Sequence, residues 1–291
     1  MRNIKSYLKG EHMIRFISLI FFLFTVLFAK EYQIIEDRSD LKILNPLLSS
    51  RKTKKLILKN GLQLYLISDP NADQSAAALS VNAGSWNDPE KYPGTAHFLE
   101  HMLFKGTKAY PDEREFMRFI WERGGTPNAY TAPDRTVYMF SINHQSFEEA
   151  LNRFSHFFID PIFHPSGIER ELFAVDQEFA KNIENDNWRE YQISKEIGNP
   201  NHPNRKFSTG NSKTLSDIPR KELISFYKNN YSANLMRLVI YSSISLDDLT
   251  KMAIEKFQKV KDRLDEFSRA GIESPDIIRY ARFWKKLRTY I

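Results

Sequence analysis

The chain has 291 residues, of which 42% are hydrophobic and 13% aromatic, a composition typical of a packed globular protein with one large domain or two smaller ones. Its formal net charge of +6 is unevenly placed, because residues 1–29 carry +3 and residues 277–291 carry +5, which leaves −2 for the body between them. A protein that binds nucleic acid is expected to have a basic folded body, so this function class is excluded.

The N-terminus has the pattern of an export signal. Arg15 is followed by fourteen uncharged residues that end at Ala29. A basic start, a short apolar run and a small final residue are typical of a signal peptide, and the run is short for a membrane anchor. We therefore expect residues 1–29 to be a signal peptide and the protein to be periplasmic or secreted. If the segment is not cleaved, it would anchor the protein to a membrane.

The first half of the chain mixes strand and helix signals. Residues 30–53 are polar and are expected to form an N-terminal strap or linker. Two strand-like runs, 56–58 and 62–67, flank Asn60-Gly61, which strongly favours a β-hairpin. Next we expect a strand at 76–81, a turn at 84–89, a helix from Gly94 to near Gly106, a helix at 113–122, strands at 128–131 and 136–142, and a helix at 147–159.

Helical patterns dominate the second half of the chain. One long pattern runs from Gly167 towards Ile197 and is followed by a loop, 199–212, that is too long for a simple connector. We then expect a helix at 219–229, a strand at 235–242, and a helix at 246–259 capped by Ser245. Strands and helices are mixed without regular alternation, which indicates an α+β fold with a mixed, largely antiparallel sheet and helices packed on it.

The segment 94–106 contains His97, Glu100 and His101 in the order H-x-x-E-H. On a helix the two histidines stand one turn apart on the same face, with the glutamate beside them. Two imidazoles aimed at one point suit a zinc ion, and a catalytic zinc ion usually takes a third protein ligand and keeps one position open. The chain has no cysteine, so the third ligand must be another histidine or a carboxylate.

The long helical pattern after Gly167 offers several carboxylates as the third ligand. Glu171 and Glu178 are seven residues apart and therefore lie nearly on one face of a helix. Spacing alone does not choose between these two and the other candidates, which are Glu169, Glu184 and Glu190.

Several stretches together resemble the pitrilysin/insulin-degrading enzyme (insulinase) family of zinc metallopeptidases, the inverzincins. Glu178 follows His101 by 77 residues, as a third ligand does in that family. The resemblance covers roughly residues 50–260, which predicts a zinc metallopeptidase N-terminal domain at 54–262. Residues 170–178 match the family's third-ligand helix, and residues 128–131 match its substrate-side strand. Residues 199–211 and 231–236 match two stretches of its N-terminal domain.

The resemblance implies a role for each matching residue. His97, His101 and Glu178 are expected to bind one Zn²⁺ per chain, and Glu100 to act as the general base that activates water for peptide hydrolysis. Glu171 is expected to support the site from behind the ligands. Asn128, Ala129 and Tyr130 are expected to form an edge strand that pairs with the peptide substrate. The predicted activity is that of a zinc metalloendopeptidase.

Members of this family resemble a clamshell, in which a second half encloses the substrate. We expect the chain to lack a counterpart of that half, so two hypotheses remain open. In the first, the chain is an endopeptidase, active alone or paired with a complementary C-terminal half or a homologous chain. In the second, it is a zinc- and peptide-binding module that is catalytically incomplete.

The C-terminal segment 263–291 is expected to be a basic tail. Within residues 277–291, aromatic and aliphatic side chains share one helical stripe and basic side chains another. Such a helix could dock on a partner or on a membrane surface. We favour the simpler explanations, which are a solvated amphipathic end or the end of a truncated reading frame.

Overall fold

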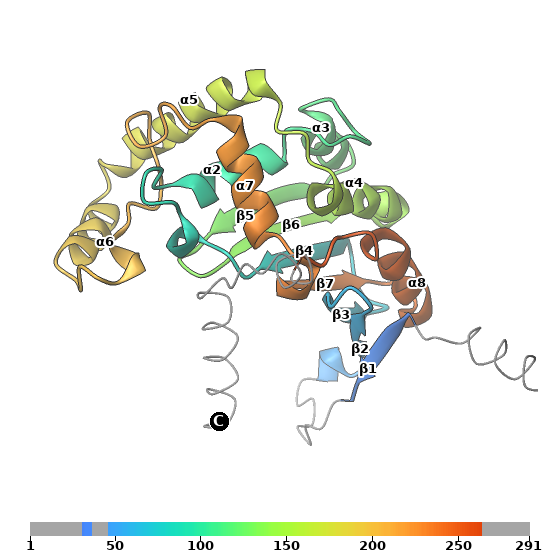
Figure 1. The fold of residues 1–291 in the computed structure, drawn as a ribbon. Coiled ribbons are helices and arrows are strands. Elements are labelled where there is room, and N and C mark those ends of the chain that lie inside the picture. The colour runs from blue at the N-terminus through green and yellow to red at the C-terminus, as the bar shows by residue number, and fades with distance from the viewer. Residues whose placement is uncertain (1–30, 37–45, 264–291) are drawn as a thin grey trace, which may run out of the picture.

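The computed structural model describes residues 31–36 and 46–263 (Figure 1). The signal peptide predicted at 1–29 lies outside these residues, as does the tail beyond Arg263. Within the described ranges, no helix combines the length and the apolar character that crossing a membrane requires.

A seven-stranded sheet forms the base of the fold. In the described residues, β3 and β7 form the one parallel pair, and the other neighbouring strands are antiparallel. The predicted α+β fold with a mixed, largely antiparallel sheet is therefore confirmed. In spatial order the strands are β1 (Tyr32–Ile35), β2 (Lys52–Leu58), β3 (Gln63–Ser68), β7 (Met236–Ser242), β4 (Ser75–Val81), β6 (Thr136–Ile142) and β5 (Thr126–Thr131).

Strand β1 was not expected, because it lies inside the polar segment 30–53 that we predicted as a strap. It is a four-residue edge strand with mostly exposed side chains, so it lacks the alternation that marks a half-buried strand. The hairpin at Asn60-Gly61 is confirmed: β2 and β3 pair on either side of it, and Gly61 has a φ of +81°.

The described residues form seven helices, and α2, α3, α4 and α8 pack directly on the sheet. Helices α2 and α3 contact β5 and β6, α4 contacts β4, and α8 contacts β2 and β3, while α5 and α7 pack on α2 (Figure 1). The helices are α2 (Thr95–Leu103), α3 (Glu115–Trp121), α4 (Phe147–Ile159), α5 (Pro165–Asn182), α6 (Asp186–Glu196), α7 (Arg220–Asn230) and α8 (Leu246–Phe257). As expected, Ser245 caps α8, because its hydroxyl accepts the N–H of Asp248.

The sequence predicted one long helical segment from Gly167 towards Ile197. This prediction is wrong, because the segment forms two helices, α5 and α6. The break has a local cause in Asn185, whose side-chain oxygen accepts the N–H groups of Asn187 and Trp188. An asparagine in this role starts a new helix rather than continuing the old one.

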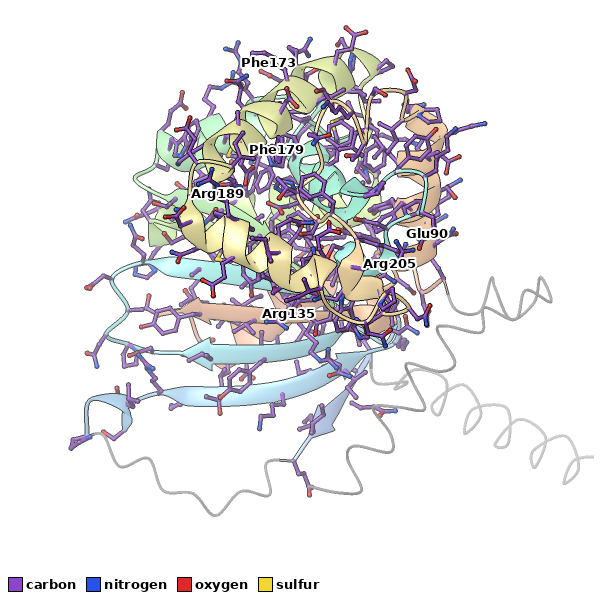
Figure 2. The ribbon with its side chains drawn as sticks, turned by 90° about the vertical axis from the view of Figure 1, so that its left-hand side faces the viewer. Glu90, Arg135, Phe173, Phe179, Arg189 and Arg205 are labelled. Atoms are coloured by element: carbon purple, nitrogen blue, oxygen red, sulfur yellow. The ribbon has the colours of Figure 1, made fainter. Side chains whose placement is uncertain are left out.

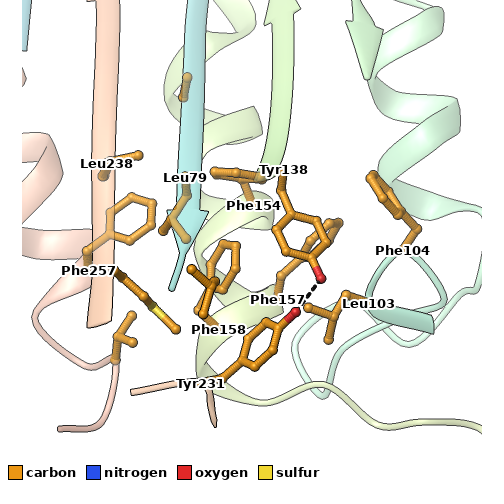
Figure 3. Packing of buried hydrophobic residues seen from close by; sticks show 14 of the residues in the cluster. Leu79, Leu103, Phe104, Tyr138, Phe154, Phe157, Phe158, Tyr231, Leu238 and Phe257 are labelled. Carbon is orange, nitrogen blue, oxygen red and sulfur yellow. Dashed lines mark hydrogen bonds between the residues drawn. The ribbon is translucent and has the colours of Figure 1, made fainter. Parts of the chain in front are cut away.

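Aromatic side chains fill the core between the sheet and the helices. Tyr138 of β6 donates or accepts a hydrogen bond of 2.8 Å with Tyr231, and both rings are fully buried (Figure 3). Phe157 of α4 has ring contacts with Phe104 and Phe116, whose centroids lie 5.2 Å and 4.8 Å away. Such edge-to-face contacts add to the stabilisation that burial of the rings provides.

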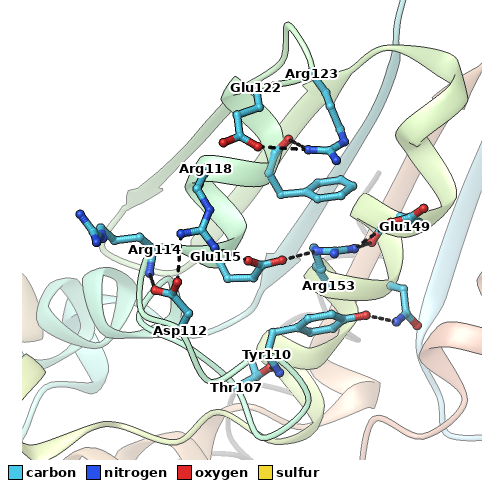
Figure 4. Close-up of polar contacts among 12 residues, drawn as sticks. Thr107, Tyr110, Asp112, Arg114, Glu115, Arg118, Glu122, Arg123, Glu149 and Arg153 are labelled. Atoms are coloured by element: carbon cyan, nitrogen blue, oxygen red, sulfur yellow. Dashed lines mark hydrogen bonds and ion pairs between the residues drawn. The ribbon is translucent and has the colours of Figure 1, made fainter.

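A polar network fastens α3 to α4 (Figure 4). Glu115 accepts hydrogen bonds from Arg153 at 3.0 Å and from Arg118 at 2.8 Å, and Arg118 also bonds to Asp112 at 3.0 Å. The Arg153 guanidinium lies 3.8 Å from the centroid of the Phe119 ring. Because α3 packs on β5, this network also fixes the helix beside the outermost strand.

We predict that Phe157→Ala lowers the free energy of unfolding by about 3–5 kcal/mol, since it removes a ring from a core that cannot collapse around the cavity. Chemical denaturation of the purified chain measures this change. Phe173→Ala is the matched control, because Phe173 is 67% exposed, and we expect it to change stability by less than about 0.5 kcal/mol. Equal effects of the two substitutions would contradict this view of the core.

Candidate metal centre

Helix α2 presents the H-x-x-E-H residues at the junction of the sheet edge with α5. Its apolar side chains are buried on β5, β6, α5 and α7, which leaves the histidines as its partly exposed positions. The rings of His97 and His101 lie edge to face, with centroids 4.8 Å apart. The helix therefore brings the two imidazoles together as the i, i+4 spacing predicts.

Glu178 of α5 faces both histidines. Its Oε2 atom lies 3.4 Å from Nε2 of His97 and 3.6 Å from Nε2 of His101. In a tetrahedral zinc site with bonds of about 2.0–2.1 Å, ligand atoms lie about 3.4 Å from one another. The donor types and the spacing of the three side chains thus fit a zinc ion. In the described part of the chain, these residues make up the one cluster of His and carboxylate donors able to hold a metal.

The other ring nitrogen of each histidine has a partner of its own. Nδ1 of His97 donates to the carbonyl oxygen of Thr209 at 2.7 Å. Nδ1 of His101 lies 3.3 Å from Oε2 of Glu171, whose Oε1 is 2.6 Å from Nζ of Lys105. Such partners fix the orientation of a metal-binding imidazole and leave its Nε2 lone pair for the metal. Glu171 therefore contacts the ring nitrogen of His101 that does not face Glu178.

Sequence reasoning missed two members of this arrangement. Thr209 contributes a backbone carbonyl, a group present in every residue, so its type carries no signal. The nearest hint was the unusual length of the loop 199–212. Lys105 lies two residues beyond the end of α2, and its ion pair with Glu171 depends on how α5 packs on α2, which spacing along the chain does not record.

Without a metal, the three candidate ligands form a charged cluster. Burial alone would lower the pKa of His101, but its hydrogen bonds to Glu171 and Glu178 outweigh burial and raise it to about 9. The pKa of His97 is also raised, because its hydrogen bond to Glu178 and the nearby carboxylates overcome the opposing effect of burial. Hydrogen bonds from the two histidines hold the pKa of Glu178 far below its usual range.

Glu100 lies on the same helix but points to a different partner. The hydroxyl group of Thr131, at the end of β5, donates to its Oε2 atom at 2.7 Å. Glu100 is only 7% exposed, and burial raises the pKa of its carboxyl group, although His97 and the Thr131 hydroxyl oppose the shift. A carboxyl group with a raised pKa beside a metal site is well suited to take up and release a proton.

Strand β5, which contains Asn128, Ala129 and Tyr130, is the outermost strand on this side of the sheet. Among the described strands it pairs only with β6, so its other edge is open. Its side chains alternate between exposed and half-buried, and Tyr130 is 44% exposed. Because α2 packs on β5, the open edge lies close to the metal cluster. An extended peptide can add to such an edge through backbone hydrogen bonds.

Two models of one peptidase family match the chain. Residues 63–201 match "Insulinase (Peptidase family M16)", and residues 217–289 match "Peptidase M16 inactive domain". The first match includes the motif helix, the open strand β5 and the helix that carries Glu178.

Known proteins with similar sequences are several times longer than this chain. The insulin-degrading enzyme of Homo sapiens is 45% identical over 220 residues, which are 73% of this chain and 22% of that protein. The A-factor-processing enzyme of Saccharomyces cerevisiae is 45% identical over 228 residues, 76% of this chain and 22% of the relative. The chain thus spans less than a quarter of the length of either relative.

The fold is similar to that of a solved structure. The crystal structure of pitrilysin superposes with a TM-score of 0.76 at 37% sequence identity. The superposition covers 80% of this chain and 25% of pitrilysin.

We predict that zinc binding releases protons and becomes tighter as the pH rises towards 9. The pKa of His101 is raised to about 9 in the metal-free chain, so this ring is protonated at neutral pH and must lose a proton to bind a metal. Titration calorimetry in buffers of different ionisation enthalpy measures the proton release. Equal heats in all buffers at pH 7 would contradict the prediction.

The same shift makes the stability of the metal-free chain depend on pH. Since the pKa of His101 is higher in the folded state, its stabilising contribution is complete below about pH 6.5 and is lost as the pH rises through about 9. The zinc-loaded chain should not show this loss, because its imidazoles are already neutral. Thermal denaturation between pH 6 and 9, with and without zinc, is the comparison to make.

Proposed function

This chain belongs to the insulinase family, peptidase family M16, and from that premise we propose that it carries the metal site and general base of a zinc metalloendopeptidase. The proposal rests above all on the convergence of Nε2 of His97, Nε2 of His101 and Oε2 of Glu178, at the 3.4 Å and 3.6 Å separations that a shared zinc ion requires. In this proposal the three residues are the protein ligands of one zinc ion.

A bound zinc ion supplies a Lewis acid, which polarises a peptide carbonyl group and lowers the pKa of water. Glu100 then has the role of proton carrier. Its buried carboxylate, held in place by Thr131, accepts the proton of the attacking water and later donates it to the leaving amine. The raised pKa of Glu100 suits both steps, since it favours proton uptake without preventing release.

We further propose that the peptide substrate binds as an added strand along the open edge of β5, at Asn128, Ala129 and Tyr130. Backbone hydrogen bonds to such an edge do not depend on the side chains of the peptide. The extended conformation and size of the peptide would therefore matter more for selection than its sequence. The contact of α2 with β5 supports this placement, because it sets the bound strand beside Glu100.

A second candidate function is a zinc- and peptide-binding module that needs a complementary chain for turnover. Two observations favour it: the relatives are more than three times as long, and α5 and α6 have large apolar side chains on their outer surface. Phe173, on the outside of α5, is 67% exposed (Figure 2), and Ile197, at the end of α6, is 80% exposed. A complementary half or a homologous chain could cover this surface and enclose the peptide.

Export from the cytoplasm remains a proposal based on residues 1–29. It is supported by the basic residues before the apolar run and by Ala29 at its end. We propose a periplasmic or secreted protein on this basis.

We predict that Glu100→Gln keeps the zinc ion but lowers peptide cleavage by at least about 10²–10⁴-fold, because the variant keeps the shape of the side chain and loses the proton acceptor. Metal analysis and a quenched fluorescent peptide measure the two properties. Glu169→Gln is the control, since Glu169 is an exposed carboxylate on α5, and it should change neither. If the wild-type chain binds zinc and cleaves nothing, the binding-module candidate is correct.

Spacing in the sequence did not decide between Glu171 and Glu178 as the third zinc ligand. We predict that substitutions of these two residues have different effects on zinc binding. Glu178→Gln should weaken zinc binding more than Glu171→Gln, for which a loss of about 10–100-fold is typical of a residue behind a ligand. Competition with a chelator of known affinity gives both values. A larger loss for Glu171→Gln would reverse the assigned roles.

A further inference from the structure

The first turn of α2 is capped by a side chain that comes from outside the helix. Gly94 occupies the N-cap position with a φ of +95° and has no side chain with which to accept the free N–H groups of the helix. Asp88, six residues earlier, takes this role: its Oδ2 accepts the N–H of Gly94 at 2.7 Å, and its Oδ1 accepts the N–H of Ala96 at 2.8 Å. Asp88 therefore fixes the residue that directly precedes His97.

The same end of α2 is in close backbone contact with the loop that carries Thr209. A Cβ atom at Gly94 would lie 2.3 Å from the Cα atom of Gly210, so a side chain has no space here. Gly210 also has a positive φ of +79°. The contact brings the Thr209 carbonyl to His97, and the position of the ring thus depends on how the loop sits against the helix.

Basic side chains hold this loop in place, and two of them join it to the segment that contains Asp88. Nζ of Lys206 donates to the backbone carbonyl of Asp88 at 2.6 Å, and it lies 3.2 Å from Oε1 of Glu90. Arg205 makes a second ion pair with Glu90 at 2.7 Å (Figure 2). Lys195, which is only 3% exposed, donates to the hydroxyl group of Ser208 at 3.1 Å. The loop is therefore held at several points along its length.

We propose that Asp88 is a positioning residue for His97, which sets the start of α2 while the Thr209 carbonyl sets the rotation of the imidazole ring. This inference rests on the zinc site of the proposed function. The two histidines then have separate supports, since His101 is held by Glu171 of α5. Loss of Asp88 should act through His97 and leave the placement of His101 unchanged.

Burial of the Asp88 carboxyl group opposes folding, because the charged group loses its contact with water. The residue is 2% exposed, and burial raises the pKa of its carboxyl group to about 7, although the N–H groups of Ala96 and Gly94 oppose the shift. An apolar side chain would avoid that cost. It could not accept two N–H groups in a helix turn that has no other cap.

Asp88→Asn tests the proposal in the 291-residue chain. The asparagine keeps the shape of the side chain but has one acceptor atom and one donor group, so it can satisfy only one of the two N–H groups. We expect zinc affinity to fall about 10–100-fold in competition with a chelator. The visible absorption of the cobalt-substituted chain should also change, because it reports the geometry of the ligands around the metal.

A double-mutant cycle separates positioning from general stability. In a His97→Ala background, Asp88→Asn should change metal affinity by less than about twofold, because the ligand through which it acts is gone. Asp69→Asn is the matched control: Asp69 is also buried, but it bonds to Arg51 and Tyr241 instead of α2. It should lower stability and leave zinc affinity and the cobalt spectrum unchanged.

Two outcomes overturn the inference. The first is a folded Asp88→Asn chain with wild-type zinc affinity, and the second is an equal loss of affinity with and without His97. If Asp88→Asn does not fold, Lys206→Met tests the part of the inference that concerns Thr209, since it loosens the loop and keeps the carboxylate. Wild-type zinc affinity and an unchanged cobalt spectrum in this variant would also overturn the inference. These readouts do not need turnover. Absence of zinc from the wild-type chain would instead refute the proposed function.

Discussion

Helix α2 can hold two polar rings at one point because nearly all its other side chains are buried. Phe98, Leu99, Met102 and Leu103 have no exposed surface, and burial of four such side chains is worth about 6–12 kcal/mol. This packing fixes the helix between the sheet, α5 and α7, and therefore fixes the direction in which its one open face points. The metal cluster, the buried Glu100 and the neighbouring strand edge all depend on that placement.

The charges of the site explain why two histidines can lie beside so many carboxylates. In the metal-free chain, Glu178 raises the pKa of both histidines and Glu171 raises that of His101, which favours the protonated form of each ring. A divalent cation would interact with the same carboxylates when it binds the neutral imidazoles. The Thr209 carbonyl and Glu171 already hold the two imidazoles in the metal-free chain, so the site is organised before a metal arrives.

Local signals in the sequence were sufficient for most of the fold. Asn60-Gly61 marked a hairpin, and H-x-x-E-H marked two imidazoles on one helical face, because both depend on residues close together in the chain. The choice of Glu178 over Glu171 depends instead on how α5 crosses α2, which no spacing within α5 records. Asn185 caps the start of α6 and so interrupts a helical segment that periodicity alone predicted to be continuous. The contact of the Thr209 carbonyl with His97 could not be predicted for a simpler reason. Every residue has a backbone carbonyl group, so the residue type gives no signal.

The position of β7 in the sheet has a consequence for how the chain assembles. This strand, at Met236–Ser242, lies between β3 and β4 and is the last strand of the described sequence to be synthesised. Until it is made, the sheet exists as two separate pieces, β1-β2-β3 and β4-β6-β5, each with an unpaired edge. Pairing of β7 with β3 joins residues more than 170 positions apart, and such distant contacts form slowly. A ribosome must therefore deliver almost the whole domain before its central strand can close the sheet, and the unpaired edges need protection from aggregation in the meantime.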